Sequence, residues 1–226
     1  MNARQAAWQG VRRSLALAAG AFPFGIAAGI AATEAGWSPL QAAFMSIGVF
    51  AGAAQLAVLE LSTTGASIGM LVLVAVVINS RLVLYSAGLS RAFSGHSLLR
   101  KLGLAYLLTD HAYALTVARH EEPEGHTHDT AFYLGVGLTL WCAWQLGTVV
   151  GATVGMGAPP ALGVDFAAPL AFIALAVPAC RGRTNLATAA ASLCTYFLVS
   201  GLPASFRLMT AVAVGLAVGA FLDRER

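Results

Sequence analysis

Charged side chains are scarce in this chain of 226 residues, since Asp, Glu, Lys and Arg together make up 10% of it. An average soluble domain has about 25%. Hydrophobic residues make up 58%, and apolar runs close to the length that crosses about 30 Å of hydrocarbon recur along the chain. The composition excludes a soluble protein and predicts an all-α polytopic membrane protein.

Recognisable enzyme motifs are absent as well. The sequence contains no phosphate-binding Walker motif, nucleophile elbow or zinc motif, so we expect neither an enzyme nor a bound cofactor. Basic residues form no cluster interleaved with aromatics, and nucleic acid is therefore not an expected partner. Without a nucleotide site, uphill transport by this chain must draw on an ion gradient or on a partner.

Potential metal ligands are few and poorly spaced. Cys142, Cys180 and Cys194 show no pairing pattern and no metal-ligand spacing, which indicates small packing residues. His126 and His128 lie with acidic residues in a polar stretch, but this spacing alone is weak support for a metal site. We expect a solvated loop that binds no functional metal.

Apolar segments divide the chain into six to eight expected helices. The long polar stretch between them is 119–129. The segments are 14–33, 39–61, 68–89, 102–118, 130–154, 166–179, 185–200 and 206–222.

Two of these segments are irregular. Residues 39–61 are interrupted by Gly48, Gly52 and Gln55, and residues 166–179 are short and bracketed by prolines. If both are broken or re-entrant, the positive-inside rule is satisfied, with the acidic stretch 119–129 outside. The basic residues then inside are Arg4, Arg12, Arg13, Arg91, Arg100, Lys101, Arg181, Arg183, Arg224 and Arg226.

This assignment predicts a single transmembrane domain built from an inverted-topology repeat. The halves are 14–118 and 130–222, joined by the polar loop 119–129. Such repeats, with interrupted helices in matching positions, are typical of secondary transporters and point to the substrate site. The halves share no detectable sequence repeat, and a plain seven-helix bundle is the alternative.

Two charges inside apolar segments stand out as functional candidates. Arg81 and Asp110 lie in neighbouring segments, and a charge at membrane depth is costly and functional by default. Asn79, Tyr85 and Gln55 are further candidate site residues with hydrogen-bonding groups, and Tyr85 is one helical turn from Arg81. The alternative for the two charges is a structural ion pair, with Arg81 extending to the interface.

The remaining polar and aromatic candidates each have two interpretations. His111, next to Asp110, is either a proton relay, because its pKa lies near neutrality, or a packing residue. Trp141, Trp144 and Gln145 either belong to an interfacial aromatic belt or line a substrate cavity.

Several strings identify a family resemblance. They include residues 21–29 (AFPFGIAAG), 50–55 (FAGAAQ), 79–85 (NSRLVLY) and the pair Thr109-Asp110. Residues 141–147 and 162–172 are similar too. The chain resembles the AzlC family, the large subunits of bacterial branched-chain amino acid exporters, over nearly its whole length. Family members often carry an acidic residue where this chain has His111, so proton coupling, if it uses that position, must differ here.

The resemblance implies export of valine, leucine and isoleucine, with methionine as a further candidate, across the bacterial cytoplasmic membrane. It also implies a small, separately encoded AzlD-like membrane subunit. Together with the residues above, it predicts that Arg81 and Asp110 bind the charged ends of an amino acid. Phe50, Leu56 and Phe172 are expected to line the pocket for its side chain.

Two other functions fit the same sequence. One is a channel or pore for small neutral solutes, built from the same broken segments. The other is a non-transporting membrane scaffold for a partner subunit. Dependence of flux on an ion gradient separates the exporter from the channel, and substrate binding by the purified protein argues against the scaffold.

Overall fold

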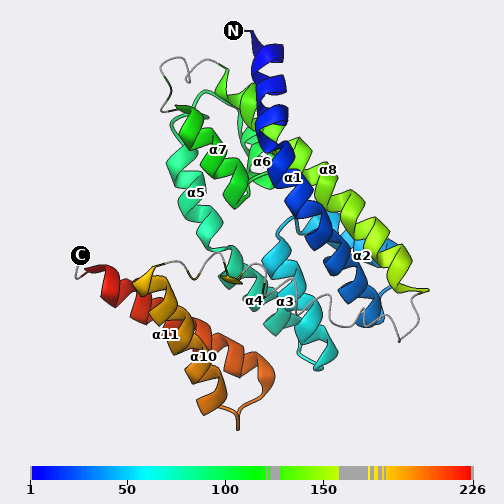
Figure 1. Ribbon diagram of the computed structural model, residues 1–226, viewed down its shortest axis with the longest axis vertical. Coiled ribbons are helices and arrows are strands. Elements are labelled where there is room, and N and C mark those ends of the chain that lie inside the picture. The colour runs from blue at the N-terminus through cyan, green and yellow to red at the C-terminus, as the bar shows by residue number, and fades with distance from the viewer. Residues whose placement is uncertain are drawn as a thin grey trace.

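The computed structural model describes residues 2–120, 122, 128–157, 173, 176–177, 180 and 182–224. The regular secondary structure of these residues is entirely helical (Figure 1). The ten described helices are α1 (Ala3–Glu34), α2 (Pro39–Gly48), α3 (Gly52–Thr63), α4 (Ile68–Asn79), α5 (Arg81–Leu89), α6 (Leu98–Tyr106), α7 (Asp110–His120), α8 (Asp129–Gly155), α10 (Arg183–Leu198) and α11 (Ala204–Arg224).

Helices α1 and α8 form the central pair, and they run parallel with their backbones in contact. Gly10 of α1 meets the backbone of Phe132, whereas Gly29 meets the backbone of Thr148. Gly151 of α8 likewise meets the backbone of Ile26. A side chain at any of these glycines would collide with main-chain atoms, so glycine is what permits this contact.

Two helical hairpins enter this frame from opposite ends and meet near its middle (Figure 1). In hairpin α6–α7, His96 bonds to Thr130 at the start of α8, and Leu107 contacts Gly137 farther along. Helix α7 then runs back to the end of the frame where α8 begins, as the bond between Arg119 and Asp129 shows. Hairpin α2–α3 comes from the other end, and its turn lies against the middle of α8.

The capping residues explain where the hairpins begin and turn. Ser38 and Gln41 form a capping box at the start of α2, with Pro39 in its first turn. The turn between α2 and α3 occupies residues 49–51. Thr109 caps α7, since its hydroxyl accepts a hydrogen bond from the Ala112 N–H.

Helices α4 and α5 form one bent element that runs the length of the frame. They meet at Ser80 with a bend of 41°. The Ser80 hydroxyl donates to the Val77 carbonyl at 2.7 Å, a local bond that competes with regular helix. Helices α10 and α11 pair antiparallel, with Gly215 against Ser192 and Gly219 against Thr188.

The number of membrane-length helices differs from the six to eight expected. Among the described residues, α1 and α8 are long and apolar enough to cross a membrane, and the bent pair α4–α5 makes a third span if counted as one. Residues 39–61 are broken, as the sequence indicates, but residues 68–89 and 102–118 are broken as well. Most of the expected segment 166–179 lies outside the described residues.

The parallel course of α1 and α8 corrects the expected sidedness. The charge pattern put Arg13 inside and the stretch 119–129 outside, yet Arg13 bonds directly to Glu122. The cause is segment 102–118, which forms a hairpin of α6 and α7 instead of one continuous helix.

An opposite-direction relation does appear over shorter units. Hairpin α2–α3 followed by the α4–α5 element forms one unit, and hairpin α6–α7 followed by α8 forms the other. The element order is the same in both, and the directions are opposite (Figure 1). A repeat with bounds 14–118 and 130–222 stays a prediction.

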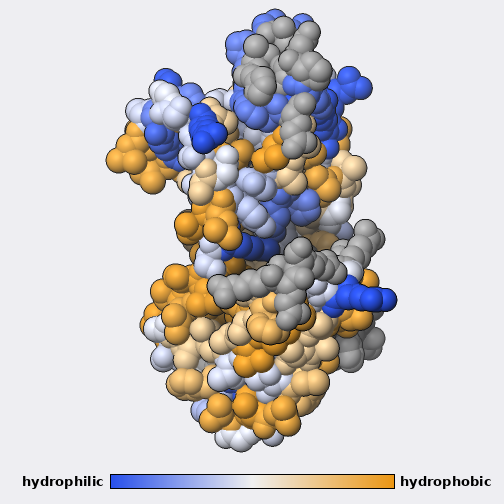
Figure 2. Space-filling view, turned by 90° about the vertical axis from the view of Figure 1, so that its left-hand side faces the viewer, coloured by the Kyte–Doolittle hydropathy of each residue, from blue (hydrophilic) through white to orange (hydrophobic). Residues whose placement is uncertain are grey.

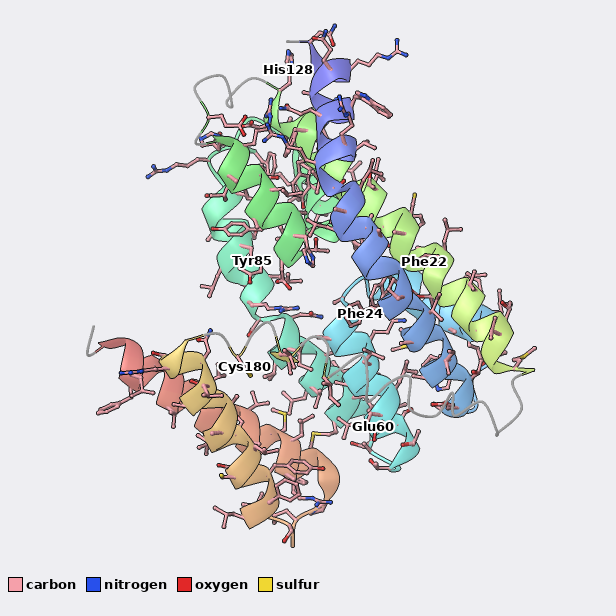
Figure 3. The ribbon with its side chains drawn as sticks, in the orientation of Figure 1. Phe22, Phe24, Glu60, Tyr85, His128 and Cys180 are labelled. Carbon is pink, nitrogen blue, oxygen red and sulfur yellow. The ribbon has the colours of Figure 1, made fainter. Side chains whose placement is uncertain are left out.

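Charge is distributed unequally between the two ends of the frame. One end, here termed the arginine-rich end, carries Arg13, Arg91 and Arg119, whereas the other carries Glu34 and Glu60. Figure 2 shows hydrophilic side chains gathered toward the end with the N-terminus and mostly hydrophobic ones over the opposite end. Figure 3 places Glu60 and His128 toward these opposite ends.

Candidate functional site

A cavity of about 680 Å³ lies where three helix interruptions converge. Its walls come from α1 and α8 and from the breaks between α2 and α3, α4 and α5, and α6 and α7. Irregular backbone at membrane depth is tolerated only where it is buried in protein or lines a cavity. The volume falls in the range of small-molecule sites, about 300–1,000 Å³.

Arg81 and Asp110 form an ion pair in this wall. Arg81 Nη1 lies 3.0 Å from Asp110 Oδ2, and the two side chains are 43% and 41% exposed. Both residues are the first of their helices, α5 and α7, so neither sits inside a continuous helix as the sequence suggested. Asp110 lies at the end of α7 where the helix dipole favours negative charge.

Polar atoms without partners cluster beside the ion pair. Asn79 Oδ1 and Asp110 Oδ1 are buried and accept no hydrogen bond from the described residues. Gln55 Nε2 is also unpartnered, although Gln55 Oε1 accepts from Trp144 Nε1 at 3.2 Å. Buried polar groups normally have partners, so these atoms mark a place where polar groups of a ligand can bond.

The remaining wall of the cavity is apolar. Leu17 and Phe24 contribute from α1, Leu82 from α5, and Leu140 and Trp144 from α8. The Trp144 ring lies against Gly52, where a Cβ would be 2.6 Å from the ring. The cavity thus combines one pair of opposite charges with a surface suited to an aliphatic side chain.

The start of α3 also lies in the cavity wall. Ala51 precedes this helix and caps it with no side-chain hydrogen bond, whereas α7 has its Thr109 cap. Residues 50–53 all line the cavity. The first N–H groups of a helix have no partner within it and attract negative charge, so this end suits an anionic group.

The structure brings together five of the nine predicted site residues. Those that line the cavity are Phe50, Asn79, Arg81, Asp110 and His111. Tyr85 lies on α5 (Figure 3), with its hydroxyl beside the Asp110 carboxylate, and its ring stacks on Tyr113 with centroids 4.6 Å apart. Gln55 and Leu56 are buried in α3, and Leu56 packs in the core between α1, α3 and α8. Phe172 lies outside the described residues.

The structure contains a second polar cluster at the two ends of residues 119–129, where the sequence predicts only a solvated loop. Arg119 is 1% exposed, lies over the Phe132 ring, and bonds through Nη1 to Asp129 Oδ1 at 2.7 Å. His120 Nδ1 contacts Asp129 Oδ2 at 3.0 Å. The flanking pattern of Arg-His before the loop and Asp after it was the available signal.

Metal binding finds no support in the part of the chain that the structure describes. Within it, no three His, Cys, Asp or Glu side chains lie close enough together to hold a metal ion. His126 lies outside the described residues, so the expectation for this loop stays a prediction.

Comparisons with known proteins identify a family and relatives of this chain. A family model with the description "AzlC protein" matches residues 16–157. The inner membrane protein YgaZ of Escherichia coli is 29% identical over 150 residues, which are 66% of this chain and 61% of YgaZ. An uncharacterized membrane protein of Helicobacter pylori J99 is 28% identical over 162 residues, 71% of this chain and 70% of that protein. No solved structure matches the chain.

Proposed function

The chain belongs to the AzlC family, and on that premise we propose that it is a secondary transporter that exports branched-chain amino acids across the bacterial inner membrane. Valine, leucine and isoleucine are the proposed substrates, with methionine as a further candidate. The observation that carries the proposal is the cavity, in which Arg81 and Asp110 face an apolar wall at the meeting point of broken helices.

The chemistry of an amino acid zwitterion matches this wall. Its carboxylate needs a cation or helix N-terminus, which Arg81 and the start of α3 supply. Its ammonium group needs acceptors, and Asp110 and Asn79 supply oxygens that lack donors at present. An aliphatic side chain fits against Phe24, Phe50 and Trp144. Leu56 supports the cavity from the core, so it is not part of the proposed contact surface.

Coupling to an ion gradient is the second part of the proposal. Asp110 and His111 are adjacent and both line the cavity, so a carboxylate lies beside an imidazole, and both are groups that can bind or release a proton. A proton taken up by Asp110 weakens its attraction for Arg81 and for a substrate ammonium group. This competition links proton movement to substrate release.

The charge distribution supports one orientation in the membrane. No Lys or Arg occurs in residues 14–80 or 130–157, which include the frame's opposite end. The arginine-rich end accordingly faces the cytoplasm under the positive-inside rule. An export substrate then enters from the end where α1 and α8 begin. A small AzlD-like subunit is proposed as the partner on the basis of the family alone.

Proteoliposome transport tests the proposed function. The purified chain, with and without a coexpressed AzlD-like subunit, is reconstituted and loaded with radiolabelled leucine. We expect efflux that saturates, accelerates with a proton gradient, and is inhibited by valine and isoleucine but not by glutamate or lysine. Flux that does not saturate and does not depend on the proton gradient would indicate a channel. Flux equal to that of protein-free vesicles, with the subunit present, would refute transport.

A further inference from the structure

The turns of the two hairpins are joined directly at the middle of the protein. Tyr106, the last residue of α6, donates its hydroxyl hydrogen to the Ile47 carbonyl at 2.6 Å. Ile47 lies in the last turn of α2, so this bond connects hairpin α6–α7 to hairpin α2–α3. The Tyr106 ring also lies near Phe50, at a centroid distance of 6.3 Å, and Phe50 lines the cavity.

The Ile47 carbonyl has a physical need for this partner. The last four carbonyl groups of a helix lack partners within it, and at membrane depth no water from the hydrocarbon is available to replace them. In α2, the Met45 carbonyl is paired with the Val49 N–H and the Ser46 carbonyl with Gln145 Nε2. Tyr106 therefore supplies the partner of a third one of these carbonyl groups, and it does so from the opposite hairpin.

Other hydrogen bonds at the two turns connect the hairpins to α8 and not to each other. Gln145 and Tyr133 of α8 bond to the Ser46 and Leu104 carbonyls respectively, and so attach each hairpin to the frame. The Tyr106 hydroxyl in turn accepts from Trp141 Nε1 at 2.8 Å. Separating the hairpins can therefore leave the frame contacts intact while it breaks the Tyr106 bond.

We propose that Tyr106 is a positioning residue that holds the two hairpin turns together, and that breaking its bond to Ile47 opens the cavity beside Phe50 to water. The inference rests on the proposed transport function, of which it supplies a gating step. Once the bond breaks, the Ile47 carbonyl requires water as a replacement partner, so opening and wetting occur together. The strength of this bond sets the fraction of molecules with a closed cavity.

Cysteine labelling tests the position of this equilibrium without any transport assay. In a background with Cys142, Cys180 and Cys194 replaced by Ser, Ala53→Cys places a thiol at a half-buried position of the cavity wall. Its reaction rate with a small, membrane-impermeant methanethiosulfonate is measured in the full chain in proteoliposomes. The variants are Tyr106→Phe, which removes the hydroxyl, and Trp141→Phe, which removes the donor to that hydroxyl. Tyr196→Phe on α10 is the matched control.

We expect Tyr106→Phe to raise the labelling rate about two- to twelve-fold, the range that corresponds to the net contribution of one hydrogen bond. Trp141→Phe should raise it less, and Tyr196→Phe should leave it unchanged. Unchanged or slower labelling in both the Tyr106 and Trp141 variants would overturn the proposal. Protection of the same thiol by leucine in the parent chain reports separately on the proposed substrate. A failure there leaves the Tyr106 result interpretable.

Discussion

Two Arg–Asp pairs lie in the first eight helices, and they are built differently. Arg119 and Asp129 are 1% and 8% exposed, and their bond joins the ends of α7 and α8. Arg81 and Asp110 are 43% and 41% exposed, and they face a cavity at helix breaks. The first pair is enclosed by Gln9, His120 and the Phe132 ring, whereas the second leaves a buried Asp110 oxygen without a donor.

The difference separates a structural ion pair from one that suits the proposed substrate site. A buried pair with every partner present has no reason to change during transport, and removing one member leaves an uncompensated charge. A pair that is open to a cavity can exchange its partner for a substrate group at low cost. Sequence position alone does not distinguish them, because both consist of the same residue types near the ends of apolar segments.

The largest expected effect is an all-or-none difference in cysteine labelling, which shows on which side of the membrane the Arg119–Asp129 pair lies. In a cysteine-free background, Ser94→Cys marks the arginine-rich end and Thr64→Cys marks the other. Intact cells should label only Thr64→Cys, and permeabilised cells should label both. Labelling of Ser94→Cys in intact cells would reverse the proposed orientation and move the Arg119–Asp129 pair to the outside.

Removal of Asp129 should cause the largest loss of stability. Asp129→Ala leaves Arg119 buried without its carboxylate, which typically costs about 3–5 kcal/mol. Thermal unfolding in detergent, followed by circular dichroism, measures the effect. Glu60→Ala serves as the control because this carboxylate is exposed at the opposite end. Equal unfolding temperatures for the two variants would show that the buried pair does not stabilise the fold.

Removal of the Asp110 charge should reduce transport while it preserves the fold. We expect Asp110→Asn to lower gradient-driven leucine export about ten-fold or more, corresponding to the loss of a hydrogen bond to a charged group. Its unfolding temperature should change less than that of Asp129→Ala. Leucine exchange, which needs no net proton movement, should survive better if Asp110 is the coupling group. Recovery of export by adding Arg81→Gln would instead identify a structural pair.

The smallest effect is expected at a third ion pair, between Arg13 and Glu122. The hydrogen bond from Arg13 lowers the pKa of Glu122, so the pair contributes stability above the ordinary glutamate pKa and loses it as the pH falls through the lowered value. Exposed pairs contribute little. Glu122→Gln should therefore lower the unfolding temperature slightly at pH about 7, with a difference that shrinks toward pH about 4. A growing difference would contradict this assignment.

The sequence predicted the pairing of Arg81 with Asp110 but not the path of the chain. Intramembrane charge singled out Arg81 and Asp110, and the structure pairs them in a cavity. Hydropathy cannot separate a crossing helix from a hairpin of two short helices, because both bury similar apolar residues. The signals at the breaks were local: Ser80 bonds to its own backbone and Thr109 caps α7. The Arg119–Asp129 pair depends on how α7 returns, and its local indication is the Arg-His pair before the polar stretch and the Asp after it.

The glycine contact between α1 and α8 has a mechanical consequence. Main-chain atoms of one helix touch those of the other at Gly10, Gly29 and Gly151, so the two axes cannot slide or roll past each other without a collision. Close-packed surfaces of this kind do not deform gradually. Under the proposed transport function, α1 and α8 are then the stationary part, and the hairpins and the bend at Ser80 are the elements that move against it.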